Sequence, residues 1–68
     1  MRPWLERYEQ AAQHVLDGRD VIDRQHDLIA RQKARGRNTE LAEQLLDRFE
    51  RSQAIFESDL ARISGEAR

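Results

Sequence analysis

The chain lacks cysteine entirely and contains one proline and three glycines among its 68 residues. Without cysteine it can form neither a disulfide nor a thiolate zinc or redox centre. It also lacks an apolar run long enough for a membrane span or a signal-peptide core, because charged residues interrupt every apolar stretch. We therefore expect a soluble, cytoplasmic protein that makes no membrane contact.

An excess of charge of one sign is lacking as well. Charged residues make up 37% of the chain, yet the formal net charge is only −1. General electrostatic attraction to nucleic acid or to an anionic membrane is therefore not expected. A chain of this length has only a marginal hydrophobic core when it folds alone. With disulfides excluded, a metal or a second chain would have to supply the missing stability.

The few helix-breaking residues divide the chain into two segments. Pro3 suits the first turn of a helix, where its missing N–H costs nothing. Gly36 begins the only clear turn signal, and Gly65 is a natural helix stop. The sequence thus predicts one domain over residues 1–68, with helices over about 3–35 and 39–64 and a turn at 36–38.

Apolar residues recur at every seventh position in both predicted helices. This spacing is typical of helices that pack against each other as in a coiled coil. The expected fold is all-α: an antiparallel two-helix hairpin that dimerises into a four-helix bundle. The expected packing seam between the helices consists of Tyr8, Ala11, Val15, Gly18, Ile22, Gln25, Ile29, Ala42, Leu45, Phe49, Phe56 and Ile63.

Gly18 lies inside the first helix, where a glycine costs about 1 kcal/mol relative to alanine. A break at this point would give three helices. A continuous helix is favoured, because the seven-residue spacing passes through Gly18 unbroken, and a small residue leaves room for a bulky one opposite. If the turn is centred near residue 37, the expected opposed pairs are Gly18 with Phe56, Ala11 with Ile63, and Gln25 with Phe49.

A second set of apolar residues flanks the seam and widens the apolar stripe of each helix to the width seen in bundles. A symmetric dimer of hairpins would cover this set most simply. The first helix should also extend past the end of the second, and its aromatic residues there would cap the bundle or anchor another protein. The expected dimer or partner contacts are Trp4, Leu5, Val21, Leu28, Leu41, Ile55 and Leu60.

Residues with catalytic or metal-binding chemistry are few. Asp23 and His26 have the i, i+3 spacing of carboxylate–histidine metal sites in bundles, but most acidic residues of the second helix fall on outward positions. The serines lie within a predicted helix, and there is no glycine-rich phosphate loop. We expect no metal, no cofactor and no enzymatic activity.

One segment concentrates charge of one sign, at the turn end of the hairpin. Cations near a helix C-terminus complement its dipole and keep an exposed tip soluble. They could instead bind phosphate or an acidic partner. The expected function is a small non-enzymatic interaction or structural module that acts as a homodimeric bundle. The alternative is nucleic-acid or anion binding through Arg31, Lys33, Arg35 and Arg37.

Most of the chain, from about residue 12 to 63, resembles a class of short bacterial proteins. They share H-V-x-x-G, then I-x-x-Q-x-x-L-I, then G-x-x-T-x-x-A-x-x-L-L-x-x-F. These motifs consist of packing and turn residues, so the resemblance implies a helical hairpin and carries over no catalytic or binding residues. The matching positions are His14, Val15, Gly18, Ile22, Gln25, Leu28, Ile29, Gly36, Thr39, Ala42, Leu45, Leu46 and Phe49.

Overall fold

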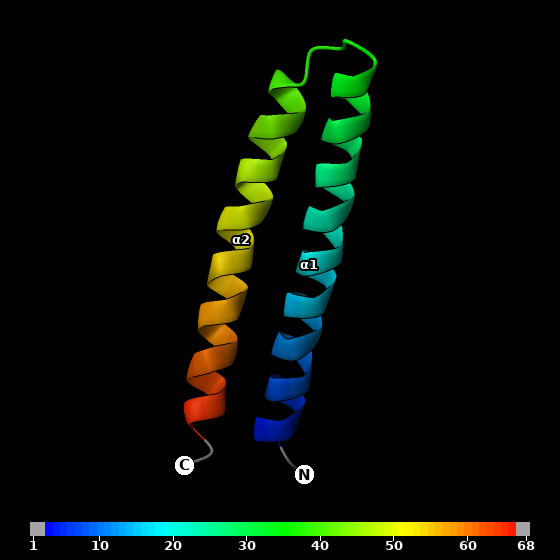
Figure 1. The fold of residues 1–68 in the computed structure, drawn as a ribbon. Helices are drawn as coiled ribbons and strands as arrows, with labels where there is room; N and C mark the ends of the chain where they lie inside the picture. Colours follow the sequence, from blue (N-terminus) through cyan, green and yellow to red (C-terminus); the bar gives the residue numbers. More distant parts are fainter. Residues whose placement is uncertain (1–2, 67–68) are drawn as a thin grey trace.

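The protein is an antiparallel pair of long helices in a computed structural model that describes residues 3–66. Helix α1 spans Pro3–Ala34 and helix α2 spans Glu40–Gly65. They lie side by side along their whole length, and the start of α1 and the end of α2 lie at the end opposite the turn (Figure 1). The hairpin measures 53 × 15 × 14 Å. The predicted all-α helical hairpin is confirmed.

Helix α1 ends through a glycine, as the sequence predicted. Gly36 has a φ of +71°, in the left-handed region that glycine adopts without steric cost. Its N–H donates to the carbonyl of Lys33 at 3.0 Å, and the next N–H, that of Arg37, donates to Gln32 at 2.9 Å. These backward bonds satisfy carbonyls that would otherwise be left open at the helix end. The chain can therefore reverse within a few residues.

Helix α2 begins with an asparagine side chain rather than a threonine side chain. The Oδ1 of Asn38 accepts a hydrogen bond from the N–H of Glu40 at 2.8 Å. Thr39 makes no capping bond with its side chain, although its carbonyl accepts from the N–H of Glu43 at 2.8 Å. Thr39 is instead buried at the head of the seam. Its burial positions α2 relative to α1.

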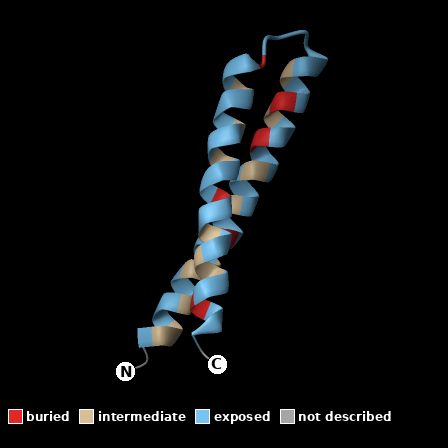
Figure 2. Ribbon diagram, turned by 90° about the vertical axis from the view of Figure 1, so that its left-hand side faces the viewer, coloured by how far each residue is buried: buried red, intermediate tan, exposed pale blue. Residues whose placement is uncertain are grey.

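The interface between the helices is a single seam in which residues recur at alternating steps of three and four. All of them are buried or half-buried, and Figure 2 shows them as a thin line between exposed surfaces. On α1 they are Trp4, Tyr8, Ala11, Val15, Gly18, Ile22, Gln25, Ile29 and Gln32. On α2 they are Thr39, Ala42, Leu46, Phe49, Gln53, Phe56, Leu60 and Ile63.

Two sequence predictions about α2 are wrong. Leu45 was expected in the seam, but its side chain is 42% exposed and Leu46 takes its place. Leu60 was expected to face a partner, but it is half-buried at a seam position. Both corrections have one cause: the seam follows the step of four from Ala42 to Leu46 instead of the step of three to Leu45, which rotates the buried face of α2 by about 50°.

The predicted pairing of the helices is wrong for Gly18, by three residues of α2, and for Gln25, whereas Ala11 and Ile63 line one hollow together, as predicted. Gly18 lies against Gln53 rather than Phe56: a Cβ on Gly18 would overlap Oε1 of Gln53 and lie 2.8 Å from its Cδ. Gln25 likewise donates from Nε2 to the carbonyl of Ala42 at 2.8 Å rather than packing against Phe49. The shift is close to one helical turn. The shift arises from the turn, because Thr39, directly before α2, is already a buried residue of the seam.

Two buried glutamines tie the helices together in opposite directions. Gln25 of α1 donates to the backbone of α2, and Gln53 of α2 donates from Nε2 to the carbonyl of Val15 on α1 at 2.9 Å. Gln53 is only 6% exposed, and its Oε1 has no hydrogen-bond partner among residues 3–66. Gly18 is therefore the recess that admits this amide, and α1 continues through it without a break.

The hydrophobic core is small. Among the described residues, the buried apolar side chains are Val15, Ile29 and Ile63. The chain exposes 5540 Å², whereas a compact monomer of 8.0 kDa exposes about 4,450 Å². Its radius of gyration is 15.8 Å, against about 11 Å for a compact domain of this length. One seam thus leaves much surface uncovered.

Candidate interaction surface

The two long edges of the seam differ in chemistry. One edge is formed by the residues that directly follow Gly18, Gln32, Ala42 and Phe56, because each step along a helix turns by about 100°. The other edge is formed, for the same reason, by the residues that directly precede Ile22, Ile29, Leu46 and Gln53. We call the first edge the charged flank (Arg19, Lys33, Glu43 and Glu57) and the second the apolar flank (Val21, Leu28 and Leu45, with Leu41 and Ile55 beside them on α2).

The charged flank is closed by ion pairs between the helices. Lys33 Nζ lies 3.1 Å from Glu43 Oε1, and Arg19 Nη2 lies 3.7 Å from Glu57 Oε1. The side chains of all four are between 48% and 63% exposed, so each pair contributes at most about 1 kcal/mol. Their larger effect is on what can bind: a partner would have to displace or desolvate charges on this side of the hairpin.

The apolar flank has no comparable ion pairs among residues 3–66 near the turn, and it exposes large apolar side chains. Leu41 is 79% exposed and Ile55 is 62% exposed, and Val21 and Leu45 are also exposed. Leu28 is half-buried beside Ile29. Together they form one stripe that crosses both helices and extends from the turn to just past the middle of the hairpin. Single exposed apolar residues are common on proteins, but a gathered set indicates a contact surface.

Shallow grooves lie along this flank, one between the helices and one on α2 alone. One, of about 330 Å³, is lined mainly by apolar surface from Val21, Phe49 and Phe56, with Gly18 and Gln53 at its floor. A second, of about 250 Å³, lies between Leu41 and Leu45. The aromatic rings of the seam thus remain partly open on this side, and side chains of a second molecule could fill the grooves.

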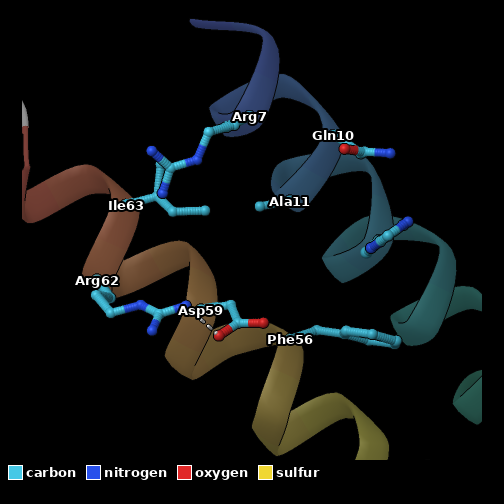
Figure 3. Close-up of a pocket in the computed structure, with 8 residues that line it drawn as sticks. Arg7, Gln10, Ala11, Phe56, Asp59, Arg62 and Ile63 are labelled. Carbon is cyan, nitrogen blue, oxygen red and sulfur yellow. Dashed lines mark hydrogen bonds and ion pairs between the residues drawn. The ribbon is translucent and has the colours of Figure 1, made fainter. Parts of the chain in front are cut away.

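At the open end of the hairpin the same side becomes polar. Figure 3 shows Arg7 on α1 and Asp59 and Arg62 on α2 around a hollow of about 270 Å³, where Ala11 and Ile63 approach each other. Arg62 pairs with Asp59 at 2.9 Å, and Arg7 pairs with Glu66 at 3.1 Å. These two arginines already have carboxylate partners within the hairpin, so the hollow does not offer a free cationic site.

The aromatic residues at the open end are part of the hairpin itself. They were expected to project past α2, and that prediction is wrong for Trp4. Its indole Nε1 donates to the carbonyl of Ile63 at 2.7 Å, and its ring stacks on Tyr8 with centroids 5.3 Å apart. Leu5 is half-buried beside them. Trp4 therefore closes the open end by satisfying a carbonyl of the last turn of α2.

The change Trp4→Phe is expected to lower the free energy of unfolding by about 1 kcal/mol, the usual value of one hydrogen bond. The ring remains, so most of the packing is kept. Urea unfolding followed by circular dichroism would measure the change. Tyr8→Phe is the control, because it keeps the stacked ring and leaves the indole bond intact. Equal stability of Trp4→Phe and the native chain would mean that the indole bond does not form in solution.

The basic residues near the turn do not act as one cluster. Lys33 is paired with Glu43 on the charged flank. Arg31, Arg35 and Arg37 are exposed, and within residues 3–66 they form no ion pair. Their charge complements the C-terminus of α1, which Gly36 closes. Arg31 alone lies at the edge of the apolar flank, since it is three positions beyond Leu28.

The described residues place no recognisable catalytic or metal-binding set together. No three His, Asp or Glu side chains of residues 3–66 come close enough to hold a metal ion. His26 and Asp23 are both exposed, and His14 lies against Phe56 with ring centroids 5.2 Å apart. In this part of the chain, neither helix is long and apolar enough to cross a membrane.

Sequence reasoning missed one residue of the seam and one exposed leucine outside the apolar flank. Gln53 was not singled out, because a polar residue gives no signal in a search for apolar spacing. Leu16, which is 57% exposed, was also passed over, and it lies on α1 away from the apolar flank. Comparison of the chain with models of protein families, with curated proteins and with solved structures found no match.

Proposed function

We propose that the protein is a non-enzymatic interaction module that acts as a homodimer, in which two hairpins join through their apolar flanks to form a four-helix bundle. The observation that carries the proposal is the contrast between the two flanks. From the turn to the middle of the hairpin, ion pairs between the helices lie on one side of the seam, and exposed Val21, Leu41, Leu45 and Ile55 lie on the other. The Arg7–Glu66 ion pair on the apolar side lies at the open end, beyond these residues. A helix pair with one apolar side has half of the surface that a bundle core needs.

The amount of exposed surface supports the same proposal. The hairpin exposes about a quarter more area than a compact monomer of its mass. That excess is close to the 600–1,000 Å² that each partner of a standard interface covers, by the usual estimate of about 1,600 Å² in total. A second hairpin on the apolar flank would therefore bring the exposed area of each chain to an ordinary value.

The test of this proposal is the mass of the protein in solution. Sedimentation equilibrium at micromolar concentrations should give the mass of a dimer, twice 8.0 kDa. The midpoint of thermal unfolding should also rise with protein concentration, because dissociation is linked to unfolding. A monomer that stays folded at all concentrations, with a midpoint that does not change, would contradict the proposal.

A further inference from the structure

We infer that the second copy docks with its turn at the opposite end, so that α1 lies antiparallel against the partner's α1 and α2 against the partner's α2. This inference rests on the proposed dimer and adds its geometry. Two symmetric arrangements can bring the apolar flanks face to face. In one the turns lie at opposite ends, and in the other they lie at the same end and α1 faces the partner's α2. The pattern along the flank separates them.

On α1 the apolar residues of the flank are bracketed by opposite charges. Asp17 lies one helical turn before Val21, and Arg31 lies three residues after Leu28. An antiparallel copy whose symmetry axis passes near Arg24 places Val21 against the partner's Leu28. The same axis places Asp17 beside the partner's Arg31. Each dimer then contains this ion pair twice, at the two rims of its apolar contact.

The same axis also aligns α2 with its copy. On α2 the symmetry axis passes near Arg48. Leu41 then lies against the partner's Ile55, and Leu45 lies against the partner's Ser52. Leu41 and Ile55 are the two most exposed apolar side chains of the flank, at 79% and 62%. They would cover each other in this arrangement. One symmetry axis thus matches Val21 with Leu28 on α1 and Leu41 with Ile55 on α2, and leaves Leu45 beside a serine.

The arrangement with both turns at one end is opposed by charge. Gly18 lies against Gln53, so residues of α1 and α2 whose numbers sum to about 71 lie at the same height in the hairpin. At equal heights Arg24 of one copy would approach the partner's Arg48, and Arg31 would lie against the partner's Leu41. The exposed cations at Arg35 and Arg37 would also meet those of the second copy. Opposite ends keep the two tips apart and place Leu41 against Ile55 instead of against Arg31. A contact between Arg24 and an arginine of the partner occurs in both arrangements, with Arg48 in one and with Arg24 itself in the other, so it does not separate them.

Cysteine cross-linking can test the geometry, because the chain has no cysteine of its own. Arg24→Cys places a thiol near the proposed symmetry axis, so mild oxidation should join two copies of this single variant. His26→Cys is the matched control. It is equally exposed and at nearly the same height, but it lies on the side of the charged flank, so it should stay uncross-linked.

The alternatives give different patterns. If Arg24→Cys fails to join its own copy but forms a disulfide when mixed with Arg48→Cys, the turns lie at the same end and the inference is overturned. If sedimentation finds only monomer, the proposed dimer itself fails. A dimer whose cross-links appear equally at residues 24 and 26 would show that neither flank is the interface. That result would overturn both the proposed dimer through the apolar flanks and its inferred geometry.

A charge exchange gives a second readout that does not depend on oxidation. Asp17→Lys and Arg31→Glu should each weaken dimerisation, by about 2- to 30-fold for two exposed ion pairs per dimer. The double variant Asp17→Lys/Arg31→Glu should recover most of that loss, since the pair is restored with reversed sign. Losses that add in the double variant would contradict the pairing of these two residues across the dimer.

Discussion

Leu45→Glu should convert the proposed dimer into a monomer and cause one of the two largest losses that we expect from a single substitution. Leu45 is 42% exposed in the hairpin, so the change removes little packing from the single chain. In the dimer it removes two leucines from the contact and places two carboxylates there. At about 1.5 kcal/mol for each leucine, the dissociation constant should rise at least about 100-fold. Sedimentation equilibrium would measure this directly.

Leu16→Glu is the matched control for this prediction. Leu16 is 57% exposed, lies in the middle of a helix as Leu45 does, and undergoes the same chemical change. It lies on α1 next to Val15 but turned by about 100° from it, away from the apolar flank. Leucine and glutamate have similar helix propensities, so neither variant should unfold its helix. Equal dimerisation of the two variants would show that the apolar flank is not the interface.

The second large effect is expected where the helices come closest. Gly18→Leu should lower the free energy of unfolding by about 2–3 kcal/mol, although leucine favours helix more than glycine does. Even a single Cβ at this position would overlap Oε1 of Gln53, whose side chain is 6% exposed and held by its bond to Val15. A larger side chain must expel the amide or separate the helices. Urea unfolding at fixed protein concentration would measure the loss.

Gln53→Ala in the same chain should remove most of that loss. The leucine would occupy the space that the glutamine vacates, and the total side-chain volume of the pair would stay nearly the same. The double variant would also lack the buried Oε1 that has no partner in residues 3–66. We therefore expect it to equal or exceed the native chain in stability. Additive losses would contradict the contact between these two positions.

The seam residues of α1 could be predicted from the sequence more accurately than the seam residues of α2. Along α1 the seam continues in sevens through Val15, Ile22 and Ile29, and nothing competes with that phase. In α2 the step after Ala42 can lead to Leu45 or to Leu46, and both are leucine. The residues one and two heptads later distinguish the two leucines. A seam through Leu46 continues to Gln53 and Leu60, whereas a seam through Leu45 would continue to polar residues.

The pairing of the helices was less accessible to sequence reasoning than their bounds. Gly36 marks the end of α1, because its φ of +71° favours glycine, and α2 ends at Gly65 with the helical conformation continuing into Glu66. The position of α2 along the axis of α1 depends instead on the burial of Thr39 in the seam and on the carbonyls to which the two buried glutamines donate. These are contacts between distant residues, and no local pattern encodes them. The two flanks, in contrast, could have been separated from charge alone once the seam was correct.

The position of the two chain ends has a mechanical consequence. The start of α1 and the end of α2 lie together at the end opposite the turn (Figure 1), where the Trp4–Ile63 hydrogen bond and the Arg7–Glu66 ion pair join the helices. A force that pulls residues 3 and 66 apart would load the seam one layer at a time. The hairpin should therefore unzip at a low and steady force, with these two contacts first to open. A force along the helix axes would load both buried glutamines at once.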